Sequence, residues 1–94
     1  MPKFFIEVPH SDDQLACAKA IQVFLQSGSH YLTNAEWGCE DGDHCGMMII
    51  EIDSKSDAMN IIPPVYRADS RVVELRRYSP ELVQSVIDGH SPHS

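Results

Sequence analysis

Long hydrophobic segments and an excess of basic charge are both missing from this 94-residue sequence. No uninterrupted apolar run is longer than four residues, as in Met47 to Ile50, which excludes a transmembrane helix, since one needs about 20 apolar residues. Lysine and arginine number 7 against 14 aspartates and glutamates, so the formal net charge is −7. A nucleic-acid surface and a site for an anionic membrane both need clustered basic charge. We therefore expect neither of these partners.

Several catalytic motifs are also missing. There is no Walker loop, G-x-G-x-x-G sequence, G-x-S-x-G elbow or H-E-x-x-H helix, which argues against nucleotide-dependent enzymes, serine hydrolases and zincins. The N-terminal segment lacks the apolar region of a signal peptide, and the cysteines number three, an odd count. These two features predict a cytoplasmic protein with reduced thiols.

The composition that is present is that of one small globular domain. Hydrophobic residues make up 43% and charged residues 22% of the chain, which is ordinary for a folded protein. We expect a single domain over residues 1–89 and a flexible polar tail over residues 90–94.

Hydrophobic periodicity predicts an α+β fold with the order strand, helix, strand, strand, helix, strand, helix. The strands are expected at 3–8, 31–39, 45–53 and 71–78, and the helices at 15–25, 58–62 and 81–88. Ser11 is expected to cap the first helix, Ser54 the second and Ser79 the third, each beside residues typical of a helix start. This order is the ferredoxin-like βαββαβ arrangement with a four-stranded antiparallel sheet and a short C-terminal helix.

One face of the predicted sheet is continuously apolar and should pack against the helices. It carries Phe4, Ile6, Val8, Met48, Ile50 and Ile52. The opposite face should carry Phe5, Glu7, Met47, Ile49, Glu51 and Asp53. Val72 and Val73 support either register of the last strand, so its buried face stays open.

The chain resembles the dimeric α/β-barrel superfamily. The resemblance rests on the start Met-Pro-Lys-Phe-Phe-Ile-Glu-Val, the strand at 31–39 and the stretch Ile-Ile-Pro-Pro-Val-Tyr-Arg at 61–67, which are similar to small bacterial members without an assigned function. It implies a homodimer in which two four-stranded sheets pack face to face. The superfamily includes cofactor-independent monooxygenases, isomerases, haem enzymes and ligand sensors, and no catalytic set of these matches this sequence.

The leading functional hypothesis is a small-molecule-binding dimer, within which a cofactor-independent enzyme would fit. Glu7, Glu51 and Arg76 are the expected polar ligand contacts, because carboxylates beside an arginine in an apolar chamber suit acid–base chemistry or a small polar ligand. Tyr31 and Trp37 are the expected apolar walls. The alternative is that the charged residues form a solvated face or salt bridges across an interface.

A transition-metal site is the second hypothesis. His10, His30 and Asp53 are expected to share one edge of the sheet, where they could ligate zinc, nickel or iron or supply a general base. A further set, Cys39, His44 and Cys45, lies in the hairpin and could bind a soft metal or form a reversible disulfide. The alternative there is an acidic solvated hairpin with incidental thiols. A third hypothesis is a structural or protein-interaction dimer that uses this acidic hairpin.

Overall fold

A four-stranded antiparallel sheet forms the centre of the fold in the computed structural model of this protein, which describes residues 1–90. The strand order is β2-β3-β1-β4. The strands are β1 (Lys3–Pro9), β2 (Glu36–Trp37), β3 (Cys45–Glu51) and β4 (Arg71–Leu75). The predicted α+β class and the antiparallel sheet are confirmed.

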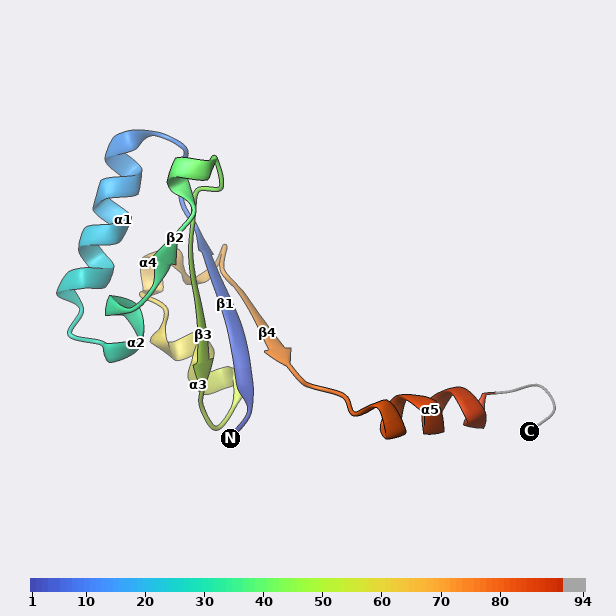
Figure 1. Cartoon of the computed structure of the whole chain (residues 1–94). Coiled ribbons are helices and arrows are strands. Elements are labelled where there is room, and N and C mark those ends of the chain that lie inside the picture. The colour runs from blue at the N-terminus through green and yellow to red at the C-terminus, as the bar shows by residue number, and fades with distance from the viewer. Residues whose placement is uncertain (91–94) are drawn as a thin grey trace.

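The described residues form five α-helices. Helices α1 to α4 cover one face of the sheet, and α5 lies apart from it (Figure 1). The covering helices are α1 (Gln14–Gln26), α2 (His30–Thr33), α3 (Lys55–Ile61) and α4 (Pro64–Arg67). A short 3-10 turn, η1 (Cys39–Asp41), links β2 to β3. The C-terminal helix α5 (Pro80–Gly89) extends away from the sheet, and none of its residues is buried.

The core lies between the sheet and the covering helices. Alternate residues of β1, Phe4, Ile6 and Val8, are each at most 1% exposed, as the sequence pattern predicts. Met48 and Ile50 of β3 lie on the same face and are buried too. The helices contribute Phe24, Leu32, Ala58 and Ile62. The apolar face predicted to meet the helices is confirmed for these residues.

The structure decides the register of the last strand. Val72 pairs with Ile6 and is 4% exposed, so it belongs to the helix-covered face. Val73 pairs with Phe5 and shares the open face of the sheet with Arg71, which pairs with Glu7. Strand β4 ends at Leu75, three residues before the predicted end, and Arg76 lies beyond it.

The second predicted strand differs most from the structure. Residues 31–39 were expected to be extended, but helix α2 occupies the first part and β2 has only two residues. The hydroxyl of Ser29 accepts a hydrogen bond from the Leu32 amide at 3.3 Å, which caps the turn, and Leu32 is buried in the core at 2% exposure. A local cap and one buried leucine therefore outweigh the extended preference of this segment.

At the C-terminal end, the predicted helix cap is confirmed. Ser79 caps α5 as expected, by accepting a hydrogen bond from the Leu82 amide, and His90 is the C-cap of that helix. The remaining part of the predicted polar tail, 91–94, lies outside the described residues. Among residues 1–90, every helix is either too short or too polar to cross a membrane.

Candidate metal centre

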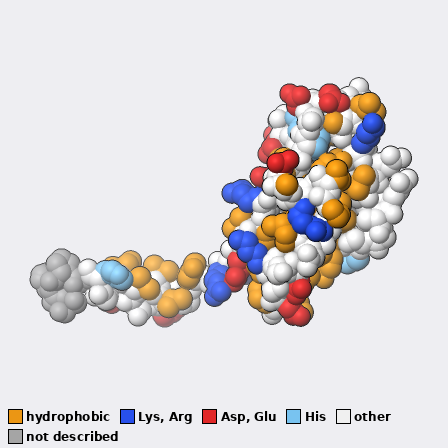
Figure 2. All heavy atoms as spheres, turned by 180° about the vertical axis from the view of Figure 1, so that it is seen from behind, with side chains coloured by type: hydrophobic (Ala, Val, Ile, Leu, Met, Phe, Trp, Pro, Cys, Tyr) orange, Lys and Arg blue, Asp and Glu red, His pale blue; other side chains and the backbone are white. Residues whose placement is uncertain are grey.

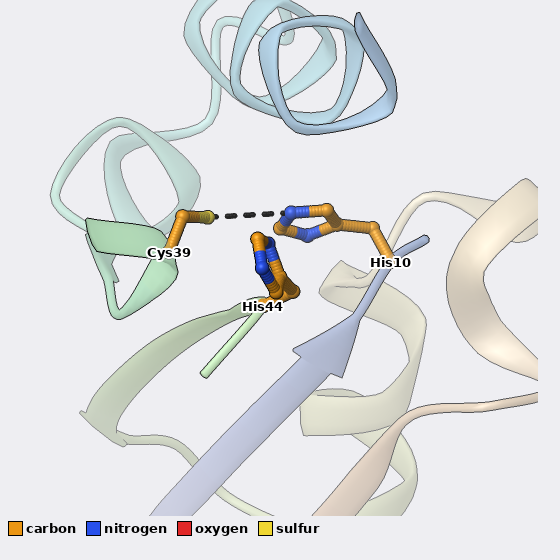
Figure 3. A group of neighbouring side chains, drawn as sticks. All are labelled: His10, Cys39 and His44. Carbon is orange, nitrogen blue, oxygen red and sulfur yellow. Dashed lines mark hydrogen bonds between the residues drawn. The ribbon is translucent and has the colours of Figure 1, made fainter. Parts of the chain in front are cut away.

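Three side chains that could ligate a metal meet at one end of the sheet (Figure 3). His10 directly follows β1, Cys39 opens η1, and His44 directly precedes β3. One nitrogen or sulfur atom from each lies within 4.8 Å of the other two, and all three residues are half-buried. Imidazole nitrogen and thiolate sulfur are the donors that zinc prefers in proteins.

The pairing of β1 with β3 positions the two histidines. The ladder ends with Pro9 opposite Cys45, and the amide of His10 donates one further hydrogen bond to the carbonyl of His44 at 3.0 Å. His10 and His44 are therefore cross-strand neighbours. Their rings stand edge to face with centroids 5.7 Å apart.

A tight turn brings Cys39 over the two histidines. The Gly38 amide donates to the carbonyl of Cys45 at 3.2 Å, and the amide of Asp43 donates to the Gly38 carbonyl at 3.0 Å. A Cβ atom on Gly38 would lie 2.7 Å from the Asp43 carbonyl oxygen, so only glycine fits this crossing. Gly42 adopts a left-handed φ of +85°, which reverses the chain after η1. The loop is therefore built around Gly38 and Gly42.

The spacing of the donors fits a small metal ion. The Cys39 Sγ atom lies 3.3 Å from the Nε2 atom of His10. Metal–ligand bonds of the usual zinc lengths at a tetrahedral angle place neighbouring donor atoms about 3.3–3.8 Å apart. His44 lies within 4.8 Å of both, so a small rotation of its side chain would complete the set.

Two buried histidine nitrogens in this cluster lack a hydrogen-bond partner within the described residues. The Nδ1 atoms of His10 and His44 are buried, and residues 1–90 offer neither of them a hydrogen-bond partner. A buried polar group without a partner costs about 1–3 kcal/mol, so such atoms are rare in folded proteins. Each histidine therefore keeps a nitrogen free for a ligand or for a supporting contact.

Burial favours the neutral form of the His10 ring. Desolvation is the largest cause that lowers the pKa of His10, and the neighbouring His44 adds to it. Histidine binds metals through the lone pair of its neutral form. At His10, burial therefore favours the protonation state that ligation requires.

The pKa of Cys39 shifts upward, which disfavours the form that binds metal. Burial, together with the hydrogen bond from the Cys17 thiol, raises the pKa of Cys39 to about 11. Only the thiolate binds metal, and a bound cation removes the proton of a coordinating thiol. Without a cation this end of the sheet therefore disfavours charge on both His10 and Cys39.

The first predicted metal set does not assemble. His10 and His30 were expected on one edge, but β1 and β2 run in the same direction, since both are antiparallel to β3. Helix α1 therefore carries the chain from the end of β1 to the opposite end of the sheet, where α2 begins with His30 (Figure 1). Asp53 follows β3 beside the start of β1, roughly 20 Å from His10 at 3.3 Å per residue.

The hairpin set is brought together in part. Cys39 and His44 meet, but the third partner is His10, whereas Cys45 lies outside the group. Cys45 is buried at 8% exposure. Its burial is the largest cause that raises its pKa to about 11, and a hydrogen bond with Asp43 adds to the shift. The signal for His10 was present in the sequence, because the predicted order puts the first and third strands side by side, with His10 and His44 at adjoining ends.

The predicted small-molecule contacts divide between two faces. Tyr31 and Glu51 line a depression of about 720 Å³ on the open face of the sheet, together with His30. Glu7 lies on the same face, but its ion-pair partner is Arg71 at 3.7 Å. The two remaining members lie elsewhere.

Arg76 and Trp37 take no part in the open-face depression. Arg76 pairs with Glu74 at 2.6 Å beyond the end of β4. Trp37 packs on the helix side, with its ring 4.8 Å from that of Phe24.

No protein family model, curated protein or solved structure matches this chain.

Proposed function

We propose that this protein binds a transition-metal ion through His10, Cys39 and His44. The observation that carries the proposal is the convergence of three donor atoms within 4.8 Å of one another, one from His10 after β1 and two from the loop between β2 and β3. The unpartnered Nδ1 atoms of the two histidines within residues 1–90 support it, because a metal ion or its supporting contacts would satisfy them.

The donor set indicates which metals would bind. Two imidazoles and one thiolate suit Zn²⁺, Co²⁺, Ni²⁺ and copper, whereas Mg²⁺ and Ca²⁺ need oxygen ligands. Three protein ligands leave the fourth tetrahedral position free for water or an exogenous ligand, as in catalytic zinc sites. The acidic residues Glu40 and Asp41 in η1 and Asp43 in the following turn add negative charge that attracts a cation.

The test is metal binding by the untagged protein, purified without chelators. We expect about one equivalent of Zn²⁺ by elemental analysis, and a sulfur-to-cobalt charge-transfer band when Co²⁺ is bound instead. His10→Ala, Cys39→Ser and His44→Ala should each weaken Zn²⁺ binding at least tenfold, and Cys39→Ser should remove the charge-transfer band.

The chain offers matched controls for these variants. His30→Ala removes a histidine at the opposite end of the sheet, and Cys45→Ser removes the neighbouring thiol. Both controls should bind Zn²⁺ as the unchanged protein does. The proposal fails if the protein binds no Zn²⁺, Ni²⁺ or copper, or if His30→Ala weakens binding as much as His44→Ala.

A second candidate function rests on the depression in the open face of the sheet. We propose that two ferredoxin-like subunits pair through this face, as in dimeric α/β barrels, and enclose a small polar molecule beside Tyr31, His30 and Glu51. The strand order β2-β3-β1-β4 and the 61% exposure of Ile49 on this face support the pairing. This proposal covers binding and assigns no reaction.

Substitution on the open face tests this second candidate. Glu51→Gln keeps the size of the side chain and removes its charge, so it should change the binding of small charged molecules without changing stability. Screening by thermal shift against small carboxylates and amines, with Glu81→Gln in helix α5 as the control, would detect this. Identical profiles for the unchanged protein and Glu51→Gln, with no compound raising the melting temperature, would count against the candidate.

A further inference from the structure

We infer that Cys17 and Cys39 form a reversible disulfide that withdraws Cys39 from the metal centre, an inference that rests on the proposed metal function. It assigns a role to Cys17, which takes no part in the donor group. The modification site is the pair of sulfur atoms, and the reacting partner is a hydroperoxide.

The contact between the two thiols carries the inference. The Sγ atoms of Cys17 and Cys39 lie 2.9 Å apart, with the thiol of Cys17 donating to the sulfur of Cys39. Cys17 lies in the first turns of α1, and Cys39 lies 22 residues later in η1. Both cysteines are half-buried, so a small oxidant can reach them, whereas Cys45 is buried.

Cys39 has two competing neighbours. Its sulfur lies 3.3 Å from the Nε2 atom of His10 and 2.9 Å from the sulfur of Cys17. Figure 3 draws the contact with His10 as a dashed line. A sulfur atom in a disulfide is no longer a thiolate and cannot serve as a strong zinc ligand. The metal-bound state and the disulfide state therefore exclude each other.

The same distance argues against Cys17 as a fourth metal ligand. Two thiolates on one tetrahedral zinc ion lie about 3.8 Å apart, given zinc–sulfur bonds of about 2.3 Å. At 2.9 Å the two sulfur atoms are closer together than two ligands of one zinc ion, and a short movement would bring them to the disulfide bond length of about 2.05 Å. Cys17 also lies outside the group of donors that are within 4.8 Å of one another.

The chemistry balances with hydrogen peroxide as the oxidant. The thiolate of Cys39, which a bound cation would keep deprotonated, attacks one peroxide oxygen, the O–O bond breaks, and Cys39 sulfenic acid and hydroxide form. The sulfur of Cys17 then attacks the sulfur of the sulfenic acid, so that an S–S bond forms and the S–O bond breaks. The departing hydroxyl takes the thiol proton and leaves as water. The two thiols lose two electrons in total, and these reduce the peroxide.

Loss of the thiolate leaves two histidines as protein ligands. Metal affinity falls when one of three ligands is removed, so oxidation should release the ion. Reduction of the disulfide restores Cys39 and with it the site. An oxidant would thus favour the metal-free disulfide state, and a metal ion would favour the reduced state.

The experiment starts from zinc-loaded full-length protein. Hydrogen peroxide is added, released Zn²⁺ is followed with a chromogenic indicator, and the linkage is mapped by mass spectrometry without reduction. Cleavage after Lys19 and after Glu40 separates Cys17, Cys39 and Cys45 into three peptides. We expect release of most of the zinc, a Cys17–Cys39 linkage, and rebinding of zinc after reduction.

Variants make the result decisive. Cys45→Ser should behave as the unchanged protein does. Cys17→Ser should bind zinc within about twofold of the unchanged protein, form no disulfide, and fail to recover its zinc after oxidation and mild reduction, because Cys39 then proceeds to irreversible acids.

The outcomes distinguish this inference from the function on which it rests. If the reduced protein binds no metal, the proposed function fails. If it binds zinc but oxidation yields no Cys17–Cys39 linkage, or a linkage to Cys45 instead, only the present inference is overturned. A loss of affinity in Cys17→Ser as large as in Cys39→Ser would identify Cys17 as a ligand and overturn it as well.

Discussion

Gly46 of β3 is covered so closely by Trp37 of β2 that no side chain fits between them. A Cβ atom at position 46 would lie 2.9 Å from the Cζ3 atom of Trp37. The indole also contacts Phe24 and His10, with centroid distances of 4.8 and 5.7 Å, so its movement would disturb both the core and the metal centre. This pair of residues therefore ties the site to the sheet.

Gly46→Ala should lower the free energy of unfolding by about 1–3 kcal/mol, the usual cost of overpacking. Chemical denaturation would measure the change. Gly89→Ala is the matched control, because a Cβ atom there meets nothing within 4 Å, and we expect a change of less than about 0.5 kcal/mol. Equal effects of the two substitutions would show that Trp37 does not pack on Gly46.

The buried thiol of Cys45 predicts a loss of stability at alkaline pH. Burial and the Asp43 hydrogen bond raise the pKa of Cys45 from 9.0 to about 11. As the pH rises, the unfolded chain loses this proton first, so the stabilisation is full below about pH 9 and disappears as the pH approaches 11.

Thermal unfolding from pH 8 to 11, in reducing and chelating buffer, checks this expectation. The unchanged protein should lose on the order of 1–2 kcal/mol more than Cys45→Ala over this range. A parallel decline of both proteins would mean that the thiol ionises as readily in the folded chain as in the unfolded one.

Among the elements, helix α1 begins at a different N-cap residue from the one that the sequence pattern predicts. The sequence pattern favours Ser11, but the side chain of Asp13 is the cap, since its Oδ1 atom accepts a hydrogen bond from the Ala16 amide at 2.8 Å. Because the cap is Asp13, Ser11 and Asp12 lie between His10 and the helix, and the His10 amide can donate its hydrogen bond to the His44 carbonyl before the helix begins. The cap position is thus linked to the geometry of the metal centre.

Asp13→Ala should therefore destabilise the protein by about 1 kcal/mol, whereas Ser11→Ala should change stability by less than about 0.5 kcal/mol. Urea denaturation of the two variants makes the comparison. The opposite order would mean that the helix begins at Ser11, as its sequence suggests.

The whole molecule is elongated. Its radius of gyration is 17.5 Å and its longest extent 59 Å, whereas a compact chain of this length has a radius of gyration of about 12 Å. Helix α5 accounts for this shape, because it projects from the body with Leu82, Val83, Val86 and Ile87 exposed, and Figure 2 shows hydrophobic side chains along it. The open face of the sheet adds a second uncovered apolar surface around Ile49.

We expect a homodimer in solution, since a monomer would leave the open sheet face in water. Light scattering coupled to gel filtration should give twice the chain mass, and Ile49→Lys should give a monomer. Leu15→Lys is the matched control, because Leu15 is 63% exposed on α1, away from the open face, while Ile49 is 61% exposed. A monomeric unchanged protein, or dissociation by Leu15→Lys, would rule out this interface.

Local and repeated signals along the chain were enough to predict several of the elements. Alternation along 3–8 and 45–53 predicted the two central strands and their buried face, because side chains in a strand alternate with a period of two. Ser54 and Ser79, each just ahead of a helix-forming segment, likewise predicted the caps of α3 and α5. These features need only neighbours along the chain.

Tertiary structure alone decided the rest. The segment 31–39 contains a helix and a two-residue strand because Leu32 packs in the core and so reinforces the local cap by Ser29, and no local pattern shows that burial. The direction of β2 separated His10 from His30. The crossing at Gly38 brought Cys39 to His10, and the packing of α1 brought it to Cys17. A metal centre depends on atoms that are close in space but far apart in sequence, so its composition follows from the packing of the elements.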